Sequence, residues 1–403
     1  MRILIISSNY FPEPMGIGLY TTDLAETLSR HGDQITVITT FPYYPWWETP
    51  LHLEKYAVEH SIQNNINVYR TRLKFSSSSK TIGRVIFEVR MWLGMRKTYQ
   101  RIDNKNFDKV ISIIPSLGAG LIARKVVKSN KKHHYLIIQD ITSNGISESG
   151  MSLGTILRHI VFPIERMIVR SASFVAVISQ SMMQPVRAMS KSSTNIVLLP
   201  NYEIVAPEAL RFSTRVDFNL PLDKFVVLHA GSIAQKQGLE NLVETARLLK
   251  STDVVFYLFG HGNAEEKISR SSQNLSNFFI RPPVPRDKFL SLLKCADLLI
   301  INERSTQISM ALPSKLISYF SSRVPVVAAV PEGGATYKAV EGLAFWVKAD
   351  EPELLAATIQ KIALYPESGQ SYAEAALRYF NQNLRAEKGR QRIMSWIRDS
   401  SII

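Results

Sequence analysis

Two glycine-bearing loops that precede helical patterns are the segments of this sequence best suited to chemistry. In the first, Gly16 and Gly18 stand just before a helical pattern over Tyr20–Arg30. Glycine lets the backbone approach a ligand, and the free N–H groups of a helix's first turn favour an anion. A plain turn is the alternative. The third glycine of a dinucleotide fingerprint is missing, which disfavours a NAD-dependent oxidoreductase.

The second loop adds a full positive charge to the same arrangement. It runs from Gly231 and Ser232 through Lys236 to Gly238, and a helical pattern follows from Glu240. A cation ahead of a helix N-terminus suits a diphosphate. An exposed, solvated lysine is the alternative for Lys236.

Two later turns are weaker candidates for the same anion. Gly260 and Gly262 form a close-approach turn after the next apolar run, where glycines are more often structural. Ser314 and Lys315 follow Pro313 in the opening turn of another helical pattern. A lysine there opposes the helix dipole unless a negative ligand offsets it, which hints at function. An ordinary helix start is the alternative.

Asp140 is the candidate for proton chemistry. It follows the apolar run Tyr135–Ile138 and could orient an acceptor hydroxyl or accept its proton, or simply cap a turn. His133 and His134 precede that run and so belong to its other end. No Cys or carboxylate stands at ligand spacing from them, so we expect no metal and no other cofactor.

Short apolar runs rich in Ile and Val must position these loops. Helical patterns separate the runs, which is typical of parallel strands buried on both faces. We predict an α/β fold with two Rossmann-like, doubly wound parallel-sheet domains that face each other across a cleft lined by strand-to-helix loops. The predicted strands are Arg2–Ser7, Gln34–Thr39, Lys109–Ile114, Tyr135–Ile138, Phe174–Ile178 and Ile196–Leu199, then Phe225–His229, Val254–Phe259, Phe278–Ile280, Asp297–Ile301, Pro325–Val330 and Phe345–Lys348.

The alternation of strands and helices pauses at a polar, proline-bearing stretch near Pro200 and Pro207. We place the hinge there, between an N-terminal domain over residues 1–200 and a second domain over residues 201–370. Residues 371–403 form a C-terminal segment that is predicted to be helical.

Composition narrows the class of protein. With 45% apolar and 20% charged residues in 403, the chain is expected to fold rather than stay disordered. One cysteine, Cys295, excludes a disulfide framework and fits a reducing cytosol. No run reaches the roughly 18 apolar residues of a spanning helix, and no signal peptide is evident. We therefore expect neither export nor membrane insertion.

The net charge of +14 lies almost wholly in one segment, since residues 70–132 hold 16 basic and 3 acidic residues. Within it, Thr81–Gln100 has helical spacing of apolar and basic residues, and Ile156–Val169 repeats the pattern. A basic amphipathic helix with Trp is typical of membrane surfaces. A core helix with a charged outer face is the alternative, and nucleic acid is disfavoured because aromatics are not interleaved. The residues predicted to bind the membrane are Arg84, Arg90, Trp92, Arg96, Lys97 and Arg101.

Taken together, the order and spacing of these motifs resemble the retaining GT-B glycosyltransferases of family 4, in their bacterial surface-polysaccharide branch. The resemblance covers nearly the whole chain. It rests on Asn9-Tyr10-Phe11-Pro12-Glu13-Pro14 with Gly16-Ile17-Gly18, Pro42-Tyr43-Tyr44-Pro45, Gln139-Asp140, Pro200-Asn201, Gly231 to Glu240, Gly260 with Gly262, and Pro313-Ser314-Lys315-Leu316 before Pro325-Val326-Val327.

The resemblance implies that Gly16, Gly18 and Lys236 bracket the diphosphate of a nucleotide sugar held mainly by the second domain. Many relatives have an arginine at the position of Ser232, and Lys315 would supply that missing charge. It also implies that Asp140 faces the acceptor, that residues 371–403 pack back on the first domain, and that a donor phosphate oxygen helps deprotonate the acceptor.

The chain departs from the family at two positions. Met310 and Ser318 stand where relatives commonly have two glutamates, the second of which binds ribose. Neither side chain is a carboxylate, and Glu303 is the nearest acidic substitute.

The resulting prediction is a cytoplasmic enzyme bound peripherally to the inner face of the membrane. Its partners would be a nucleotide-sugar donor, an undecaprenyl-diphosphate-linked saccharide and an anionic membrane surface, with no nucleic acid. A nucleotide-sugar 2-epimerase and a non-catalytic nucleotide-sugar or lipid-binding partner remain as alternatives.

Overall fold

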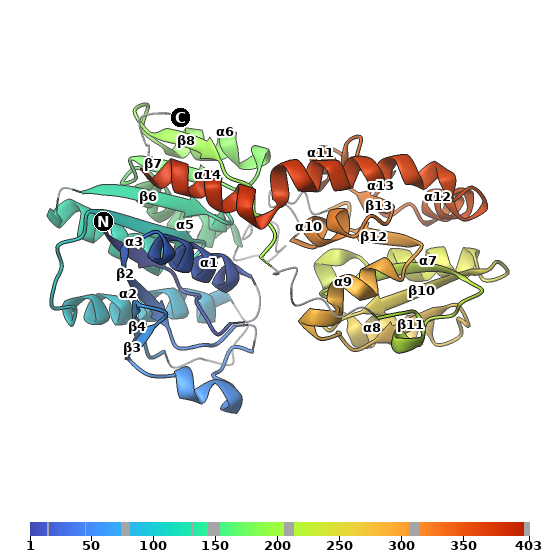
Figure 1. The fold of residues 1–403 in the computed structure, drawn as a ribbon, viewed down its shortest axis with the longest axis horizontal. Helices are drawn as coiled ribbons and strands as arrows, with labels where there is room; N and C mark the ends of the chain where they lie inside the picture. Colours follow the sequence, from blue (N-terminus) through green and yellow to red (C-terminus); the bar gives the residue numbers. More distant parts are fainter. Residues whose placement is uncertain are drawn as a thin grey trace. The chain divides into compact units, whose positions relative to one another are not determined.

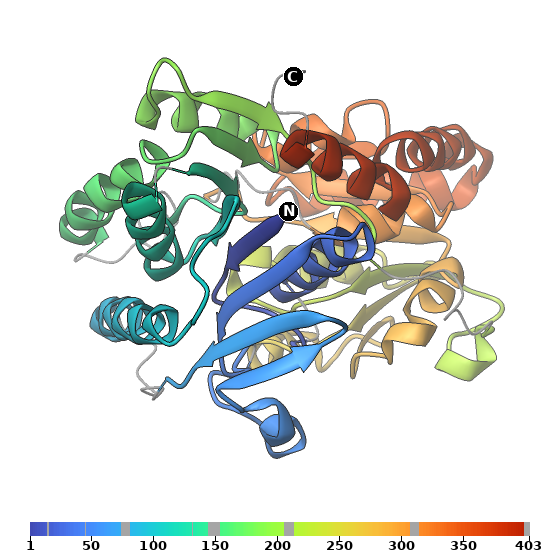
Figure 2. The ribbon, with the colours of Figure 1, turned by 60° about the vertical axis from the view of Figure 1, so that its left-hand side comes forward.

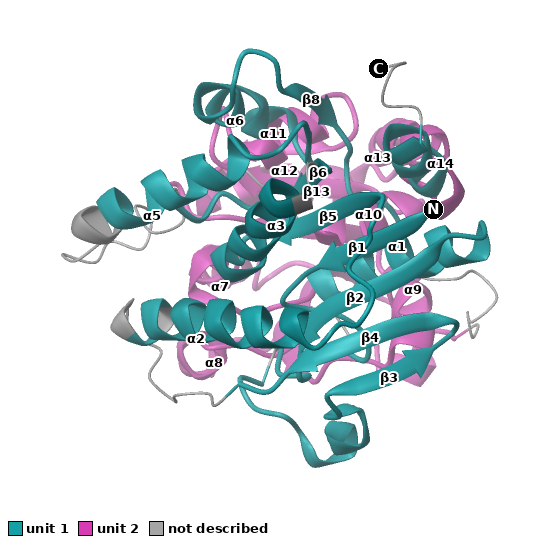
Figure 3. Ribbon diagram, turned by 90° about the vertical axis from the view of Figure 1, so that its left-hand side faces the viewer, with its two compact units in different colours: residues 1–204, 389–403 teal, residues 205–388 magenta. Residues whose placement is uncertain are grey.

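The computed structural model describes residues 1–13, 16–44, 46–73, 81–130, 132–143, 154–204, 213–306 and 314–398. The chain divides into two compact units, shown in Figure 3: unit 1 holds residues 1–204 and 389–403, and unit 2 holds residues 205–388. None of the described helices is long and apolar enough to cross a membrane.

Unit 1 is built on one eight-stranded sheet (Figure 1). Its order is β3-β4-β2-β1-β5-β6-β7-β8, and every neighbouring pair is parallel except β3 and β4. Six of these strands confirm the prediction to within two residues at each end. The strands are β1 (Arg2–Ile6), β2 (Gln34–Thr40), β3 (His60–Gln63), β4 (Ile66–Thr71), β5 (Lys109–Ile114), β6 (His133–Ile138), β7 (Phe174–Val177) and β8 (Asn195–Leu198).

The β3–β4 hairpin, which was not predicted from the sequence, forms one side of the sheet and is drawn in light blue in Figure 2. Its turn residues, Asn64 and Asn65, have φ of 49° and 63°. Asparagine tolerates this left-handed conformation, and two such residues favour a tight hairpin.

Alternate side chains of the unit 1 sheet point to opposite faces, so each face packs its own helices. Ile3 and Ile5 pack with α1 (Ile17–Arg30) and α14 (Ala386–Arg398). Leu4 and Ile6 pack with α2 (Thr81–Gln100) and α3 (Leu117–Asn130). The next helix, α5 (Gly154–Val169), lies beside α3, as Figure 3 shows.

Unit 2 repeats the arrangement with six parallel strands in the order β11-β10-β9-β12-β13-β14. All six confirm the predicted runs. The strands are β9 (Phe225–Ala230), β10 (Val254–Phe259), β11 (Phe278–Arg281), β12 (Leu298–Asn302), β13 (Val326–Val330) and β14 (Phe345–Lys348). The helices are α7 (Glu240–Leu248), α8 (Glu265–Ser272), α9 (Arg286–Lys294), α10 (Ser314–Ser321), α11 (Ala335–Val340), α12 (Pro352–Leu364) and α13 (Glu367–Tyr379).

The C-terminal segment is shared between the units. Ala376 of α13 and Phe380 and Leu384 of the following π-helical turn (Phe380–Leu384) belong to the core of unit 2. Only the part of α14 from Gly389 onward belongs to unit 1, where Trp396 is fully buried.

Each sheet reverses its strand order at one point, β1 next to β5 in unit 1 and β9 next to β12 in unit 2. Ligands of open parallel sheets bind at such switch points, outside the carboxyl ends of the strands. The loops after β1, β9 and β12 are therefore the ones to inspect.

Candidate functional site

The loop after β9 meets the first turn of α10 at the switch point of unit 2. Gly231 has a φ of 140°, and a Cβ there would lie 3.5 Å from Nζ of Lys315. Nζ of Lys315 also lies 3.1 Å from Oε1 of Gln237 and 3.3 Å from Nε2 of His229. The structure thus brings together Gly231 and Lys315, two of the residues predicted to bind the donor.

The surroundings of Lys315 do not fully balance its positive charge. Burial lowers the pKa of Lys315 to about 7; the carboxylate of Glu303 opposes this and Lys236 adds to it. Burial likewise raises the pKa of Glu303, whose Oε1 accepts a 2.7 Å hydrogen bond from Thr336. Burial and the charge of Lys315 hold the pKa of His229 well below its usual value. An anion placed beside Nζ would restore the full charge of Lys315.

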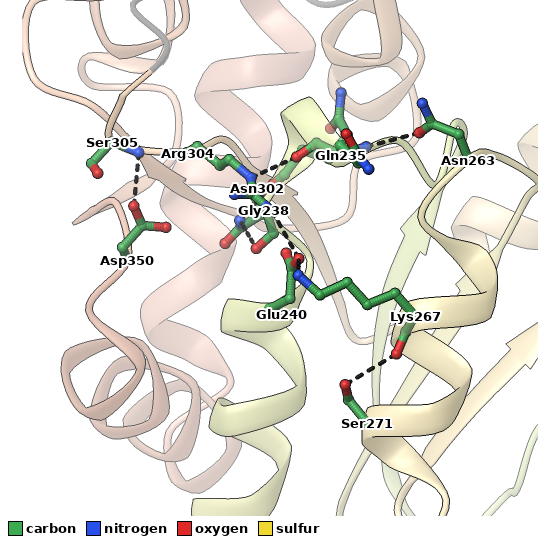
Figure 4. A network of polar contacts seen from close by, with 11 residues as sticks. Gln235, Gly238, Glu240, Asn263, Lys267, Ser271, Asn302, Arg304, Ser305 and Asp350 are labelled. Carbon is green, nitrogen blue, oxygen red and sulfur yellow. Dashed lines mark hydrogen bonds and ion pairs between the residues drawn. The ribbon is translucent and has the colours of Figure 1, made fainter. Parts of the chain in front are cut away.

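Asn302, at the end of β12, fixes the backbone of the loop after β9, which carries Lys236 and is called the lysine loop below. Its Nδ2 donates to the carbonyl oxygens of Gln237 at 2.7 Å and Gly238 at 2.9 Å. Arg304 donates from Nε to the carbonyl oxygen of Gln235 at 2.6 Å and from Nη2 to Oε1 of Glu240 at 2.8 Å. Figure 4 shows this network, which anchors the short 3-10 helix Gln235–Gln237 to the second strand of the switch point.

Three further residues that were predicted to bind the sugar donor have exposed side chains near Lys315 in the sequence or in the loop after β9. Ser232 and Lys236 lie in the loop after β9, and Ser314 opens α10. Among the residues that the structure describes, the Lys236 side chain makes no hydrogen bond or ion pair. It lies close enough to affect the pKa values of both Glu303 and Lys315. A ligand can therefore reach Lys236 without displacing a protein partner.

Gly260 and Gly262 have a structural reason to be glycine. A Cβ at Gly260 would lie 1.8 Å from the carbonyl oxygen of Gly231, and one at Gly262 would lie 2.2 Å from that of Ile233. The two loops are also hydrogen-bonded, since the N–H of Ile233 donates to the carbonyl of His261 at 2.9 Å. These glycines let the loop after β10 support the Gly231 loop, and their contact with a donor stays a prediction.

In unit 1, a buried glutamate organises the loop after β1. Oε1 of Glu13 accepts hydrogen bonds from the backbone N–H groups of Tyr43 and Tyr44, both at 3.0 Å, and Oε2 accepts one of 2.7 Å from Asn9. Burial raises the pKa of Glu13, and these hydrogen bonds oppose the rise. Glu13 thus connects the segment around Asn9 to the segment around Tyr43 and Tyr44. Both segments carry the family resemblance, but the sequence had assigned no role to Glu13.

Of the two predicted glycines of this loop, Gly18 lies against Glu13 and Gly16 lies against the ring of Tyr44. Gly16 has a φ of 67° and caps α1, while a Cβ at Gly18 would lie 3.1 Å from Cβ of Glu13. Arg70 of β4, also buried, donates to the carbonyl oxygens of Thr40 and Phe11 at 3.1 and 2.5 Å. Burial lowers the pKa of Arg70 to about 10. Buried polar contacts therefore hold the described part of the loop up to Glu13, and the contact of Gly16 and Gly18 with a phosphate stays a prediction.

Asp140 is exposed after β6. One of its carboxylate oxygens accepts the N–H of the next residue, Ile141, at 2.8 Å. Buried Glu165 of α5 holds the residues that follow, accepting the N–H groups of Thr142 at 2.8 Å and Ser143 at 3.3 Å. Burial raises the pKa of Glu165. The turn cap and the role toward an acceptor both stay predictions for Asp140.

The two neighbouring histidines lie at the opposite end of β6, as their position in the sequence indicated. His134 is buried, its Nε2 lies 2.7 Å from Oγ of Ser112, and burial lowers its pKa to about 4. It is a neutral core residue. Among the described residues, no group of three His, Cys, Asp or Glu could hold a metal ion. Of the two positions that lack the family glutamates, Ser318 lies in α10 and Met310 lies outside the described residues.

Helix α2 buries Met91 and Met95 but exposes another apolar row. Val89 is 49% and Leu93 44% exposed, on a helix that also carries exposed Arg90, Arg96 and Lys97. Of the other predicted membrane residues, Trp92 is half-buried and Arg101 forms an ion pair with Glu59 just beyond the helix. The side chain of Arg84 lies outside the described residues. Exposed apolar side chains beside basic ones are compatible with an interfacial helix as well as with a core helix, and membrane binding through α2 stays a prediction.

Comparison with known proteins gives the site a family context. Residues 211–379 match the family described as "Glycosyl transferases group 1". WcaI of Escherichia coli (strain K12), named as a colanic acid biosynthesis glycosyl transferase, is 27% identical over 397 residues, covering 94% of this chain and 96% of that protein. TuaC of Bacillus subtilis (strain 168), named as a teichuronic acid biosynthesis glycosyltransferase, is 22% identical over 404 residues, covering 95% and 90%.

Solved structures share the fold at low sequence identity. Sucrose-phosphate synthase from Thermosynechococcus elongatus matches with a TM-score of 0.76 and 13% identity, covering 99% of both chains. HepE from Anabaena, solved in complex with UDP, matches with a TM-score of 0.70 and 15% identity, covering 99% of this chain and 100% of its own. WaaG, a glycosyltransferase of lipopolysaccharide biosynthesis, gives a TM-score of 0.70 at 14% identity, covering 98% and 99%. The two parallel-sheet α/β units are those of the GT-B fold.

Proposed function

We propose that this chain, whose residues 211–379 are a glycosyl transferases group 1 domain, moves a sugar from a nucleotide-sugar donor, with retention, to an undecaprenyl-diphosphate-linked saccharide. The product would be a surface polysaccharide such as capsule, O-antigen or exopolysaccharide. The observation that carries the proposal is the half-buried Lys315 beside Gly231, at the switch point of unit 2. The names of WcaI and TuaC, both enzymes of polysaccharide biosynthesis, support the class of product.

The donor diphosphate would lie against Gly231, where the missing Cβ leaves room for oxygen atoms close to Lys315. Lys236 would add a second cation from the exposed side of the same loop. Negative charge grows on the leaving diphosphate while the sugar becomes oxocarbenium-like, so fixed cations there stabilise the transition state more than the ground state. Because these lysines balance the charge, we propose no metal ion or other cofactor.

Glu303 is better suited to act as the counterion of Lys315 than as a substitute for the missing ribose glutamate. It is buried, one oxygen is bonded to Thr336, and its charge raises the pKa of Lys315. In this proposal Glu303 balances Lys315 while the site is empty, and the diphosphate takes over when it binds.

On the acceptor side, Asp140 would orient the attacking hydroxyl. Its carboxylate is exposed at the end of β6, on a loop that Glu165 holds in place. A donor phosphate oxygen would take the proton, which is consistent with retention and needs no covalent enzyme intermediate. UDP is the first nucleotide to test, since the neighbour HepE was solved with UDP.

A lipid-linked acceptor requires the enzyme at the membrane surface. The exposed Val89 and Leu93 of α2, with Arg96 and Lys97 on the same helix, have the composition of an interfacial helix. We propose peripheral attachment to the inner face of the cell membrane through α2.

A donor screen tests the proposal. Radiolabelled UDP-, GDP- and dTDP-sugars are incubated with the purified protein and membranes that carry lipid-linked saccharides. We expect label in the lipid fraction from one donor, an anomeric configuration equal to that of the donor, and loss of transfer in Lys315→Met. A sugar inverted at one carbon in the absence of acceptor would instead identify an epimerase. Donor binding without transfer to any acceptor membrane would identify a binding protein.

A further inference from the structure

A basic groove of about 780 Å³ lies on unit 1 between α3, α5 and the turn that precedes β8. Val127, Phe162, Pro163 and Met167 contribute apolar surface to it. All its lining residues are described, and none is Asp or Glu. Six of them are cations: Arg124, Lys128, Lys132, Arg166, Arg170 and Lys191.

The groove is separate from the predicted transfer site. Arg170 and Ser171 come just before β7, and Lys132 comes just before β6, so the groove lies where these strands begin. Asp140 follows the carboxyl end of β6. The carboxyl ends of parallel strands all lie on the same side of a sheet. The groove, at the amino ends of β6 and β7, and the loop that carries Asp140, at the carboxyl end of β6, therefore lie at opposite ends of the strands.

The cations of the groove have little to balance them within the protein. Among the described residues, the side chains of Arg124, Lys128, Arg166, Arg170 and Lys191 form no ion pair and no hydrogen bond. The negative ends of α3 and α5 favour some positive charge nearby. That effect fades within the last turn of a helix, and Arg124 and Lys191 lie outside it. Gathering like charges is unfavourable unless an anion from outside enters.

The apolar lining indicates what kind of anion this is. Phe162 is 37% and Met167 36% exposed, and both line the groove together with the cations. A small hydrated anion gains nothing from such surface, and one phenylalanine is not a base-stacking platform for a nucleic acid. A phosphate attached to an apolar chain matches both parts of the groove.

We propose that this groove binds the phosphate headgroup of an anionic phospholipid, with Phe162 and Met167 against the glycerol and upper acyl chain. Helix α3 lies between α2 and α5 on one face of the sheet, so the groove adds a second lipid contact on the face that exposes Val89 and Leu93 (Figure 3). This inference extends the proposed membrane attachment but does not depend on glycosyl transfer.

Vesicle co-sedimentation of the full chain tests it, with vesicles of phosphatidylcholine alone or mixed with phosphatidylglycerol and with no saccharide acceptor present. The test variant is Arg166→Gln/Arg170→Gln/Lys191→Gln. The matched control, Lys250→Gln/Lys294→Gln/Lys361→Gln, removes the same charge from exposed positions of unit 2. An Arg166→Lys/Arg170→Lys variant keeps the groove positive, and thermal unfolding checks that each variant is folded.

We expect wild type to prefer phosphatidylglycerol vesicles and the groove variant to lose about 100-fold in partitioning, at a few-fold per charge. The unit 2 control and the Lys-for-Arg variant should stay within a few-fold of wild type. If the groove variant and the unit 2 control lost partitioning equally, net charge alone would explain the binding, and the proposal would be overturned. It would also be overturned by displacement of the protein from vesicles by inorganic phosphate at a concentration no higher than that of the anionic lipid, because the apolar lining would then contribute nothing, or by displacement by RNA at low concentration. Because no donor or acceptor is used, failure here leaves the proposed transferase activity untouched.

Discussion

The side-chain amine of Lys315 donates a 3.1 Å hydrogen bond to the amide oxygen of Gln237. An amide oxygen is a neutral partner, weaker than a carboxylate or phosphate would be. Burial lowers the pKa of Lys315 to about 7, although the charge of Glu303 opposes the shift. We expect an oxygen of a bound diphosphate to replace the amide oxygen of Gln237 as the hydrogen-bond acceptor of Lys315.

The first prediction concerns pH. An anion that binds beside Lys315 raises the pKa of the Lys315 amine. Above pH 7, where this amine is mostly neutral in the free protein, binding therefore requires Lys315 to take up a proton. Affinity for UDP should therefore fall as the pH rises above about 7, by up to about tenfold per unit. Lys315→Arg stays charged throughout and should flatten the profile. Titration calorimetry from pH 6 to about 9 measures both, and identical pH profiles for the two proteins would refute the role of Lys315.

The second prediction concerns the two lysines in catalysis. Lys236→Ala and Lys315→Met should each lower kcat by about 100 to 1000-fold, because each removes a cation from the developing charge of the leaving diphosphate. Lys250→Ala, at an exposed position of the same unit, is the matched control. Steady-state transfer assays give the comparison, and unchanged kinetics in Lys236→Ala would remove Lys236 from the mechanism.

The third prediction concerns Glu13. Glu13→Gln keeps the shape but replaces one acceptor oxygen with an amide nitrogen, which must face either Nδ2 of Asn9 or the backbone N–H groups of Tyr43 and Tyr44. The free energy of unfolding should therefore fall by about 1 to 3 kcal/mol. Glu332→Gln, at an exposed site, should change it by less than about 0.5 kcal/mol. Urea unfolding measures both. Equal midpoints for the two variants would show that Glu13 does not hold the loops together.

The fourth prediction concerns α2. Val89→Ser/Leu93→Ser should weaken binding to anionic vesicles while leaving the fold intact, because both side chains are already about half exposed to water. Neutralising Arg90, Arg96, Lys97 and Arg101 should release the protein as well. Leu222→Ser, on unit 2 and 73% exposed, is the control for loss of exposed apolar surface. Sedimentation unaltered by the α2 changes would separate α2 from the membrane.

The strands of this fold could be predicted because parallel strands buried on both faces are near-continuous apolar runs, as in Val254–Phe259, whose six residues are all buried. The hairpin of β3 and β4 lacked that signal. None of the four residues of His60–Gln63 is buried and three are polar, so only the turn residues Asn64 and Asn65 pointed to the hairpin.

The sequence singled out Gly231, Lys236 and Lys315 because each residue type carries its own chemistry; the structure brings Gly231 and Lys315 together, and the role of all three toward a donor stays a prediction. The residues that hold those groups were not singled out. Asn302 fixes the lysine loop from 64 residues away, and His229 lies 86 residues from the lysine it contacts. Such partners are created by the tertiary fold, and nothing in their local sequence pattern marks them. Likewise, helical spacing predicted α2 but could not show that Met91 would be buried and Leu93 exposed.

A crystal structure of the protein with UDP tests the central claim most directly. We predict a diphosphate oxygen within hydrogen-bond distance of Nζ of Lys315 and packed over Gly231, with the Lys315–Gln237 hydrogen bond broken or shared. A nucleotide bound elsewhere, with that hydrogen bond unchanged and Gly231 uncovered, would contradict the account.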